Sequence, residues 1–369
     1  MRQRYVMLAL LAFSLVLCSF PAVKAEARRD VGVSAESAIL YHPASGSVLY
    51  EKNADDRRGI ASTTKIVTAL TVLKRCGDLD RTVTIPQEAC GVEGSSLYLK
   101  PGEKLTVIEL LYGLLLASAN DAATALAIAC AGSVEAFADK MNGIAAEYGL
   151  LNSHFSNPHG LDAKDHYSTA RDLATVAAAA LEDETFREIV STKRSVIDGD
   201  CEPRYLHNHN KLLDLYPGCV GVKTGYTKKC GRCLVSAAER DGELLIAVTL
   251  NAPNDWNDHR SMLDQGFSQL EKRTLLTAGE YEIELPVVNG NCETVRVSNL
   301  ETVELAIPKD SPSPERAVKL PRFLAAPLFA GEIVGYVEYR LNGKTVGASP
   351  LIVRDAVREI KYKKGFFHL

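Results

Sequence analysis

The hydrophobic pattern of the chain changes near Thr274, and this change limits the fold more than any other feature of the sequence. Between residues 31 and 272, segments with apolar residues at helical spacing are mixed with strand-like segments. After Thr274 the apolar segments alternate with polar residues or are rich in β-branched residues. A chain of 369 residues suits one large domain and a smaller one. We therefore predict an α+β domain followed by a small all-β domain.

The first region carries turn and cap signals that locate several of its elements. Asp241-Gly242 joins two apolar runs as a hairpin, and Thr106 with Glu109 forms a capping-box pattern at the start of an apolar helix. Helices placed before and after a sheet built from hairpins indicate the α+β class. Strands are expected at 39–41, 48–50, 234–237 and 244–250, and helices at 66–73, 106–116 and 258–270.

The second region has strand patterns and none of the residue groupings that indicate catalysis. Strands are expected at 281–285, 303–307 and 334–339, with Asn342-Gly343 as a hairpin turn. The predicted boundaries are 1–25 for a leader, 26–273 for the α+β domain with the candidate catalytic residues, and 274–369 for the β-rich domain with a basic tail.

The first 25 residues have the layout of a secretory signal peptide. Arg2 and Arg4 precede an apolar run at 6–17, and residues 23–25 end in a small residue suited to cleavage. A run of twelve residues is shorter than the ~18 to 20 that cross a bilayer as a helix. An uncleaved N-terminal anchor stays open as the alternative. We expect an exported protein.

The charge of the chain argues against a nucleic-acid partner. The leader carries three basic residues and no acidic ones, so the remainder has 39 Lys and Arg against 46 Asp and Glu and a formal charge of −7. Proteins that bind nucleic acid usually have a strong basic excess. We therefore expect no nucleic-acid partner.

Eight cysteines follow the leader, and an exported protein meets oxidising conditions. They are too widely spaced for a disulfide-stapled scaffold, and Cys130, in an apolar helical stretch, is interpreted as a small core residue. Cys230 and Cys233 have C-x-x-C spacing. A local disulfide or plain thiols are favoured there over a zinc site, for which His207 and His209 would be the nearby ligands. No metal or cofactor is expected.

Ser62 and Lys65 form the most informative short motif, S-x-x-K, at the start of the helix expected through Leu73. Residues i and i+3 share a helix face, so the lysine amine can approach the serine hydroxyl. A neutral lysine can accept the serine proton, and a helix N-terminus favours negative charge on the attacked carbonyl oxygen. Serine at a helix start is usually only a cap, but S-x-x-K occurs once in this chain.

Two further motifs carry polar groups suited to a substrate. Ser118-Ala119-Asn120 follows an apolar helix and can place a hydroxyl and an amide in a cleft. Lys223-Thr224-Gly225 precedes the predicted hairpin and offers a cation and a hydroxyl to a carboxylate, while its glycine lets a peptide approach the strand. Taken singly, each tripeptide is more often a plain turn or strand.

The three motifs occur once each and in the order found in class A β-lactamases and penicillin-binding proteins. The sequence resembles the serine D-alanyl-D-alanine carboxypeptidases, the low-molecular-mass penicillin-binding proteins of peptidase family S11. Flanking residues extend the likeness over nearly the whole mature chain, at 94–102, 112–115, 157–161 and 166–172. The chain departs from the family at Lys228-Lys229-Cys230. The resemblance implies a β-lactamase/transpeptidase-like domain, an antiparallel sheet flanked by helices.

The resemblance also implies the catalytic roles. Ser62 is expected to be the nucleophile and to form an acyl-enzyme with the penultimate D-alanine, so that the terminal D-alanine of peptidoglycan stem peptides is removed. Lys65 is its expected proton acceptor, although the acylation base of this superfamily is disputed. Ser118 is expected to relay a proton toward the leaving group. β-Lactam antibiotics would then act as covalent inhibitors.

Five residues are implied as substrate ligands. Asn120 would hold a substrate amide, and Lys223 with Thr224 would engage the terminal carboxylate. Gly225 would let the substrate approach the strand. The backbone N–H groups of Ser62 and Tyr226 would form the oxyanion hole.

Three alternative functions fit the sequence less well. A class A-like β-lactamase would need a glutamate that activates water, but Glu182, Glu184 and Glu188 are not followed by Leu-Asn. A non-catalytic envelope-binding protein would not need Ser62 paired with a lysine. A Ser–His–Asp esterase would show G-x-S-x-G, which the chain lacks.

The last sixteen residues, 354–369, combine five basic residues with a few large apolar ones. Two interpretations stay open: an amphipathic segment on the membrane surface, or a final strand with a frayed basic end. Such a short segment would bind anionic lipid weakly and in a salt-sensitive way. We expect a location outside the cytoplasm, in the cell envelope at the outer face of the membrane, with weak peripheral contact.

Overall fold

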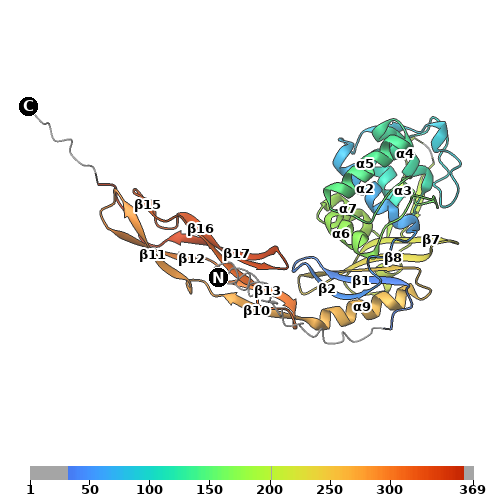
Figure 1. Cartoon of the computed structure of the whole chain (residues 1–369). Helices are drawn as coiled ribbons and strands as arrows, with labels where there is room; N and C mark the ends of the chain where they lie inside the picture. The colour runs from blue at the N-terminus through green and yellow to red at the C-terminus, as the bar shows by residue number, and fades with distance from the viewer. Residues whose placement is uncertain (1–31, 201, 361–369) are drawn as a thin grey trace, which may run out of the picture. The chain divides into compact units, whose positions relative to one another are not determined.

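A computed structural model of the chain describes residues 32–200 and 202–360. In this part, a five-stranded antiparallel sheet has the strand order β2-β1-β9-β8-β7, so β7 lies at an edge (Figure 1). The α+β class is confirmed, and so are the hairpins predicted at Asp241-Gly242 and Asn342-Gly343. The strands are β1 (Ser37–His42), β2 (Ser47–Lys52), β7 (Cys219–Thr227), β8 (Gly231–Arg240) and β9 (Glu243–Leu250).

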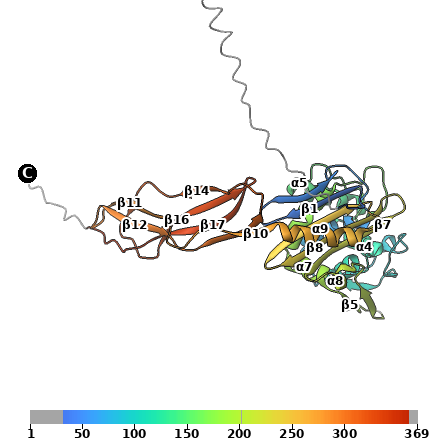
Figure 2. The ribbon, with the colours of Figure 1, turned by 90° about the horizontal axis from the view of Figure 1, so that it is seen from below.

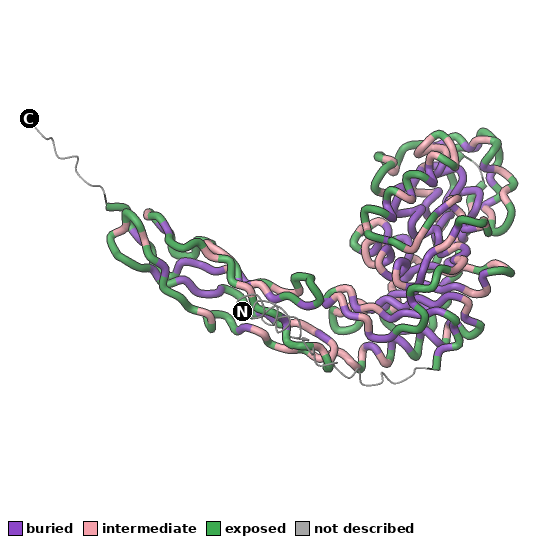
Figure 3. Tube along the Cα trace, viewed as in Figure 1, coloured by how far each residue is buried: buried purple, intermediate pink, exposed green. Residues whose placement is uncertain are grey.

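Helices cover both faces of this sheet (Figure 1). Successive residues of a strand point to opposite faces, so one strand packs against both layers of helices. Ile39 of β1 packs into the core under the larger helical group, whereas Leu40 packs into the core under the last helix (Figures 1 and 3). The larger group comprises η1 (Ala61–Thr64), α2 (Lys65–Arg75), α3 (Val107–Leu115), α4 (Asn120–Ala131), α5 (Val134–Glu147), α6 (Ala170–Leu181) and α7 (Glu184–Ser191). The last helix is α9 (Asp255–Gln269).

Two predicted helix starts agree with the structure to within one residue, whereas the last helix, expected at 258–270, begins at Asp255. The Thr106–Glu109 capping box is present at the start of α3, and α2 extends the predicted helix 66–73 by one residue at its start and two at its end. Within residues 32–200 and 202–360, no single helix is long and apolar enough to span a membrane, but α4 and α5 taken together, with a bend of 85°, pass that test. The remaining short elements are β3 (Thr82–Thr84), η2 (Gln87–Ala89), β4 (Lys104–Thr106), β5 (Arg194–Ile197), β6 (Arg204–His207) and α8 (Leu212–Leu215).

The C-terminal region is all-β, as predicted (Figure 2). Val297, Val337 and Leu351 lie in its own buried core. The predicted boundary at 273/274 falls inside β10, which pairs with β13, and it stays a prediction. A six-stranded sheet has the order β14-β16-β17-β12-β11-β15. The strands are β10 (Leu270–Leu276), β11 (Glu282–Val288), β12 (Thr294–Asn299), β13 (Val303–Pro308), β14 (Glu315–Lys319), β15 (Leu324–Ala325), β16 (Ile333–Leu341) and β17 (Lys344–Val353).

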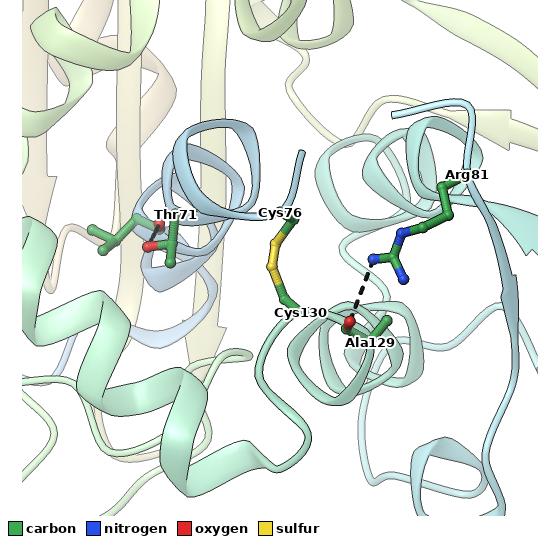
Figure 4. The surroundings of a disulfide bond; sticks show 6 residues. Thr71, Cys76, Arg81, Ala129 and Cys130 are labelled. Carbon is green, nitrogen blue, oxygen red and sulfur yellow. Dashed lines mark hydrogen bonds between the residues drawn. A yellow bond between two sulfur atoms is a disulfide. The ribbon is translucent and has the colours of Figure 1, made fainter. Parts of the chain in front are cut away.

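A disulfide joins Cys76, which caps the end of α2, to Cys130 in α4, with the two Cα atoms 5.2 Å apart (Figure 4). The interpretation of Cys130 as a plain core residue is therefore wrong. Helical spacing placed it in an apolar stretch, but its partner lies 54 residues away in sequence. The other described cysteines are free thiols: Cys90, Cys219, Cys230, Cys233 and Cys292.

Candidate active site

Ser62 lies in the 3-10 turn η1, which leads directly into α2. The Thr63 hydroxyl closes the turn by donating to the carbonyl oxygen of Ile60 at 2.6 Å. The other three residues of η1 are buried, whereas Ser62 is partly exposed. The turn therefore leaves Ser62 partly exposed at the protein surface, whereas its neighbours in η1 are packed in the core.

The amine of Lys65 contacts three polar atoms. Nζ lies 2.9 Å from Ser62 Oγ, 2.7 Å from Asn120 Oδ1 and 2.7 Å from the carbonyl oxygen of His159. A neutral amine has two N–H groups and one lone pair. It satisfies all three neighbours when it donates to the two carbonyl-type oxygens and accepts the Ser62 hydroxyl proton.

Burial favours this neutral form. The Lys65 side chain has no exposed surface. Its pKa lies well below the usual 10.5, mainly because burial penalises the charged amine. The nearby charge of Lys223 lowers the pKa further, whereas Asp121 acts in the opposite direction. Lys65 therefore has the position and the protonation behaviour of a general base.

Asn120 is the first residue of α4 and is held on both sides. Its backbone N–H donates to the carbonyl oxygen of Ser95 at 2.7 Å, and Nδ2 donates to the carbonyl oxygen of Glu93 at 2.5 Å. Oδ1 accepts from Lys65. Both ends of the side-chain amide thus have partners within the protein, which makes Asn120 a positioning residue for the amine. Its predicted role as a substrate-amide ligand stays a prediction.

Ser118 precedes α4 with a φ of 60°, a left-handed backbone that non-glycine residues seldom adopt. Its surface is 4% exposed and lines the same cleft as Ser62. Such outliers often occur at functional sites, where the surrounding structure holds them. The turn therefore aims a second hydroxyl at the cleft.

Lys223 and Thr224 lie side by side in β7 but differ in exposure. Lys223 is 1% exposed, and burial lowers the pKa of its amine to about 7. Its Nζ donates to the carbonyl oxygen of Thr224 at 3.0 Å. Among the described residues that line the cleft, Thr224 is present and Lys223 is not. The structure thus brings the threonine, rather than the lysine, to the cleft surface.

Gly225 is required by the protein's own packing. A Cβ atom at this position would lie 3.0 Å from the backbone nitrogens of both Ser62 and Thr63. Strand β7 therefore packs directly against η1, which leaves no space for a side chain. This contact gives a structural reason for the glycine, and its predicted role in the approach of a peptide stays a prediction. It also sets the backbone of Tyr226 beside the turn that carries Ser62.

A cleft of about 360 Å³ lies between η1, the Ser118 turn and the edge strand β7. Five predicted residues line it: Ser62, Ser118, Thr224, Gly225 and Tyr226. The sequence indicated no role in this cleft for six further lining residues: Ser95, His209, Lys211, Arg232, Asp255 and Trp256. They come from four separate parts of the chain and form no motif of their own; Ser95 belongs only to the stretch 94–102 that extends the family likeness.

Two histidines without a predicted role support the Ser62 turn. His159 provides a carbonyl oxygen to Lys65, and His166 Nε2 lies 2.7 Å from Thr64 Oγ1. Burial lowers the pKa of His159 to about 3 and that of His166 to about 4, so both are neutral at neutral pH. In the described part of the chain no histidine hydrogen-bonds to Ser62, so the Ser–His–Asp alternative has no geometric support.

Cys230 and Cys233 are buried thiols beside the segment that precedes Ser62. The Cys230 thiol donates to Asp162 Oδ1 at 3.1 Å, and the Cys233 thiol lies 3.9 Å from the carbonyl oxygen of Gly59. Across residues 32–200 and 202–360, no three His, Cys, Asp or Glu residues are grouped to hold a metal ion. Of the two alternatives left open for this pair, a local disulfide or plain thiols, the structure has plain thiols.

Profiles of two protein families match the chain. The profile of peptidase family S11, described as D-alanyl-D-alanine carboxypeptidase, matches residues 23–254. The profile of the C-terminal domain of penicillin-binding protein 5 matches residues 270–359. The first match covers more than half of the chain, and the second covers most of the β-rich region.

Individual proteins give the same result. The chain is 32% identical to D-alanyl-D-alanine carboxypeptidase DacF of Bacillus subtilis, over 96% of this chain and 95% of the relative. It is 34% identical to DacA of Escherichia coli, over 91% and 88%. The crystal structure of penicillin-binding protein 5 from Haemophilus influenzae has a TM-score of 0.66 at 31% identity, covering 89% of this chain and 98% of that one. The Streptomyces K15 DD-transpeptidase has a TM-score of 0.61 at 36% identity, covering 64% and 98%.

Proposed function

The chain belongs to the D-alanyl-D-alanine carboxypeptidases of peptidase family S11, and we propose that Ser62 is the nucleophile of this enzyme. The enzyme removes the terminal D-alanine from D-Ala-D-Ala stem peptides of peptidoglycan, and it binds penicillin. Ser62 Oγ forms a bond to the carbonyl carbon of the penultimate D-alanine, the C–N bond breaks, and D-alanine leaves. Water then hydrolyses the ester, releases the shortened peptide as a carboxylate and restores the hydroxyl.

Lys65 accepts the Ser62 proton in this proposal. The contact of 2.9 Å between Nζ and Oγ carries the assignment, together with the complete burial of the amine. Ser118, whose turn faces the same cleft, relays a proton to the nitrogen of the departing D-alanine. Lys223 acts on the base through its charge, which lowers the pKa of Lys65.

The backbone N–H groups of Ser62 and Tyr226 stabilise the oxyanion that forms during attack. The tight packing of Gly225 against Ser62 supports this role, because it brings the two backbones together at the cleft. The start of the η1–α2 segment adds the positive end of a helix dipole.

In the described sheet β7 has a strand neighbour on one side only, and the stem peptide extends along its other edge. Thr224 contributes a hydroxyl to the terminal carboxylate, and Lys223 contributes positive charge from behind the strand. Asn120 holds the lysine amine and presents its remaining amide N–H to a substrate carbonyl.

Intact-mass analysis after exposure to benzylpenicillin tests the nucleophile. We expect one penicilloyl group per chain, located on Ser62 by peptide mapping, because a β-lactam mimics D-Ala-D-Ala but releases no leaving group. Ser62→Ala should remain unlabelled. A labelled Ser62→Ala variant would refute the assignment.

The structure gives the β-lactamase alternative no support. That activity requires a carboxylate that activates water for rapid deacylation. Glu182, Glu184 and Glu188 are absent from the described lining of the cleft. Glu188 instead accepts a hydrogen bond from the Tyr112 hydroxyl at 3.3 Å.

The proposed location is the cell envelope, with a role in cell-wall remodelling and cell shape. It rests on the signal-peptide pattern of residues 1–25, which lie outside the described residues. Within the tail, Val357 bridges to Leu328 and Glu359 bridges to Gly290, so the segment up to 360 belongs to the β-rich region. Membrane contact is therefore proposed for residues 361–369, which the structure does not describe.

A further inference from the structure

A second cavity, of about 300 Å³, lies beside the turn between β7 and β8. Its described lining comes from residues 57–59 before η1, from the loop between α5 and α6 at 162–167, and from residues 229–230 in the turn. It shares no described lining residue with the cleft that contains Ser62. It is therefore a separate cavity, for which the proposed catalytic function has no use.

The described lining of this cavity carries four cations and a single carboxylate. They are Arg57, Arg58, Lys164, Lys229 and Asp162. The Arg58 guanidinium is neutralised from outside the cavity, because it pairs with Glu36 and, at 3.1 Å, with Asp56, neither of which lines it. The other three cations form no ion pair within residues 32–200 and 202–360. Three positive charges against one negative charge leave the cavity with two uncompensated positive charges.

The one carboxylate is held by neutral donors rather than by these cations. Asp162 Oδ1 accepts from Thr227 Oγ1 at 3.2 Å and from the Cys230 thiol at 3.1 Å. These bonds fix the carboxylate against the end of β7 and the turn that follows it. The carboxylate therefore does not pair with any of the three cations.

Arg57 is preorganised to bind a ligand. Its Nε and Nη2 donate to Asn152 Oδ1 at 3.3 and 3.0 Å. Its central carbon lies 5.1 Å from the centre of the Tyr167 ring, which also lines the cavity. Nη1 has no acceptor among the described residues. A guanidinium fixed in this way offers its remaining N–H groups to an anion with little further loss of conformational freedom.

Two buried groups in the lining are neutral. His166 Nδ1 accepts from the backbone N–H of Ser156 at 3.1 Å, so Nε2 carries the proton and donates to Thr64 Oγ1. Burial lowers the pKa of His166 to about 4 and raises the pKa of the Cys230 thiol. At neutral pH neither group adds charge, so the cations set the sign of the cavity. His166 also connects the cavity to η1, the turn that carries Ser62.

The charges and their arrangement suit a phosphate group. A phosphate monoester carries a charge of about −1.5 to −2 at pH 7 and has three acceptor oxygens, whereas a carboxylate has one charge and two oxygens. Lysine binds phosphate as a point charge, and arginine binds it through its N–H groups. The three unpaired cations come from three different segments, so they can approach one phosphate from different directions. Lys229 also lies in the stretch 228–230, where the chain departs from its family.

We propose that this cavity is a second ligand site of the enzyme, which binds a phosphate dianion between Arg57, Lys164 and Lys229. The ligand is free phosphate or the phosphate end of a monoester, since both present the same group. A volume of about 300 Å³ is at the lower end of the range for small-molecule sites. The inference goes beyond the proposed hydrolysis of stem peptides and does not depend on the identity of the nucleophile.

Isothermal titration calorimetry with inorganic phosphate, glycerol 3-phosphate and acetate tests the proposal. We expect one phosphate or one glycerol 3-phosphate per chain, with an affinity that falls as the salt concentration rises. Acetate, with a single charge, should bind at least about tenfold more weakly. Tighter binding of glycerol 3-phosphate than of phosphate identifies a monoester as the ligand, and equal binding identifies the free ion; either result supports the site.

Variants that remove one charge locate the site. Lys229→Gln and Lys164→Gln should each weaken binding about 3- to 10-fold, and the double variant should lose about the product of the two. Lys228→Gln is the matched control, because Lys228 is exposed on the same turn but does not line the cavity. Lys211→Gln is a second control, because Lys211 lines the catalytic cleft instead. Both controls should bind phosphate as the wild type does.

Four results would overturn the proposal. They are no binding of either phosphate compound up to about 10 mM, unchanged binding in the double variant, an equal loss in Lys228→Gln, and a loss in Lys211→Gln. The third would indicate a general attraction of anions to the surface, and the fourth would place the anion in the catalytic cleft. Thermal unfolding of each variant checks that these exposed substitutions leave the fold intact. Penicilloyl labelling of Ser62 tests the proposed function separately.

Discussion

The amine of Lys65 lies 2.9 Å from the hydroxyl oxygen of Ser62 and has no exposed surface. A lysine in water would be protonated at neutral pH and could not accept a proton. Burial lowers the pKa of Lys65 well below its usual range and so shifts this preference toward the neutral amine, because the charged form loses its hydration. The same packing that buries the helix α2 in the core thus prepares its first residue as a base.

Replacement of Lys65 by arginine tests whether the site needs the positive charge of this residue or its ability to accept a proton. Arginine keeps the positive charge but does not deprotonate in proteins. We expect Lys65→Arg and Lys65→Ala to lower kcat/KM for D-Ala-D-Ala peptides to a similar extent, by about 10²- to 10⁴-fold. Stopped-flow measurement of β-lactam acylation checks this directly. Substantial activity in Lys65→Arg would show that the charge, and not proton transfer, is what the site uses.

Asn120→Asp should shift the pH dependence of the enzyme. A carboxylate 2.7 Å from Nζ favours the protonated amine, so the pKa of Lys65 rises. The acidic limb of the kcat/KM profile should move to higher pH, and activity at neutral pH should fall. Asn120→Ala removes the contact without adding charge and serves as the comparison. If the acidic limb of the kcat/KM profile does not move in Asn120→Asp, the group that titrates in this profile is not Lys65.

The local motifs, but not the contacts between them, could be predicted from the sequence. Ser62 and Lys65 are three residues apart, and helical geometry brings them together. The bonds from Lys65 to Asn120 and to His159 span 55 and 94 residues and depend on how α2, α4 and the loop after α5 pack. For the same reason the hairpin β8–β9 could be read from Asp241-Gly242, whereas the pairing of β1 with β9 could not.

Lys223 should make stability depend on pH. Its folded pKa of about 7 lies below the ~10.4 of an unfolded lysine, so between these values the unfolded chain binds the extra proton. Stability from this group therefore rises as pH increases from about 7 to 10. In Lys223→Met the melting temperature should rise less over this range than in the wild type. Parallel curves for the two proteins would contradict the buried, weakly basic state of Lys223.

The disulfide Cys76–Cys130 should contribute substantially to stability. It closes a loop with a sequence separation of 54, for which chain-entropy arguments give about 4 kcal/mol. Thermal unfolding of Cys76→Ala/Cys130→Ala should occur at a clearly lower temperature. Dithiothreitol should destabilise the wild type and leave the double variant unaffected. Equal sensitivity of the two proteins to reductant would mean that the bridge does not form.

Gly225 shows that a sequence pattern can mark a position without giving the full physical reason for the residue there. The K-T-G pattern identified the position, and strand statistics suggested room for a substrate. The structure shows that the backbone of η1 occupies the space a Cβ atom would need. A glycine in a motif indicates that no side chain fits at that position, but it does not indicate which neighbouring atoms occupy the space. No sequence pattern indicated Arg232, because its partners Asp255 and Trp256 are more than twenty residues away along the chain and contact it only in the folded structure.

The basic tail should act as a weak, separable membrane contact. Residues 354–360 are tied to the β-rich region through the bridge between Val357 and Leu328, so truncation at Val353 would also damage that region. Truncation after Ile360 removes Lys361, Lys363 and Lys364 with two phenylalanines and leaves these bridges in place.

On anionic lipid each basic residue contributes about 1 kcal/mol at low salt. Flotation with anionic liposomes should therefore carry the mature chain but not the truncated one, and 0.5 M salt should release it, because the Debye length there is only about 4 Å. Identical flotation of the two proteins at low salt would exclude the tail as an anchor, while equal carboxypeptidase activity in both would confirm that the truncation spares the active site.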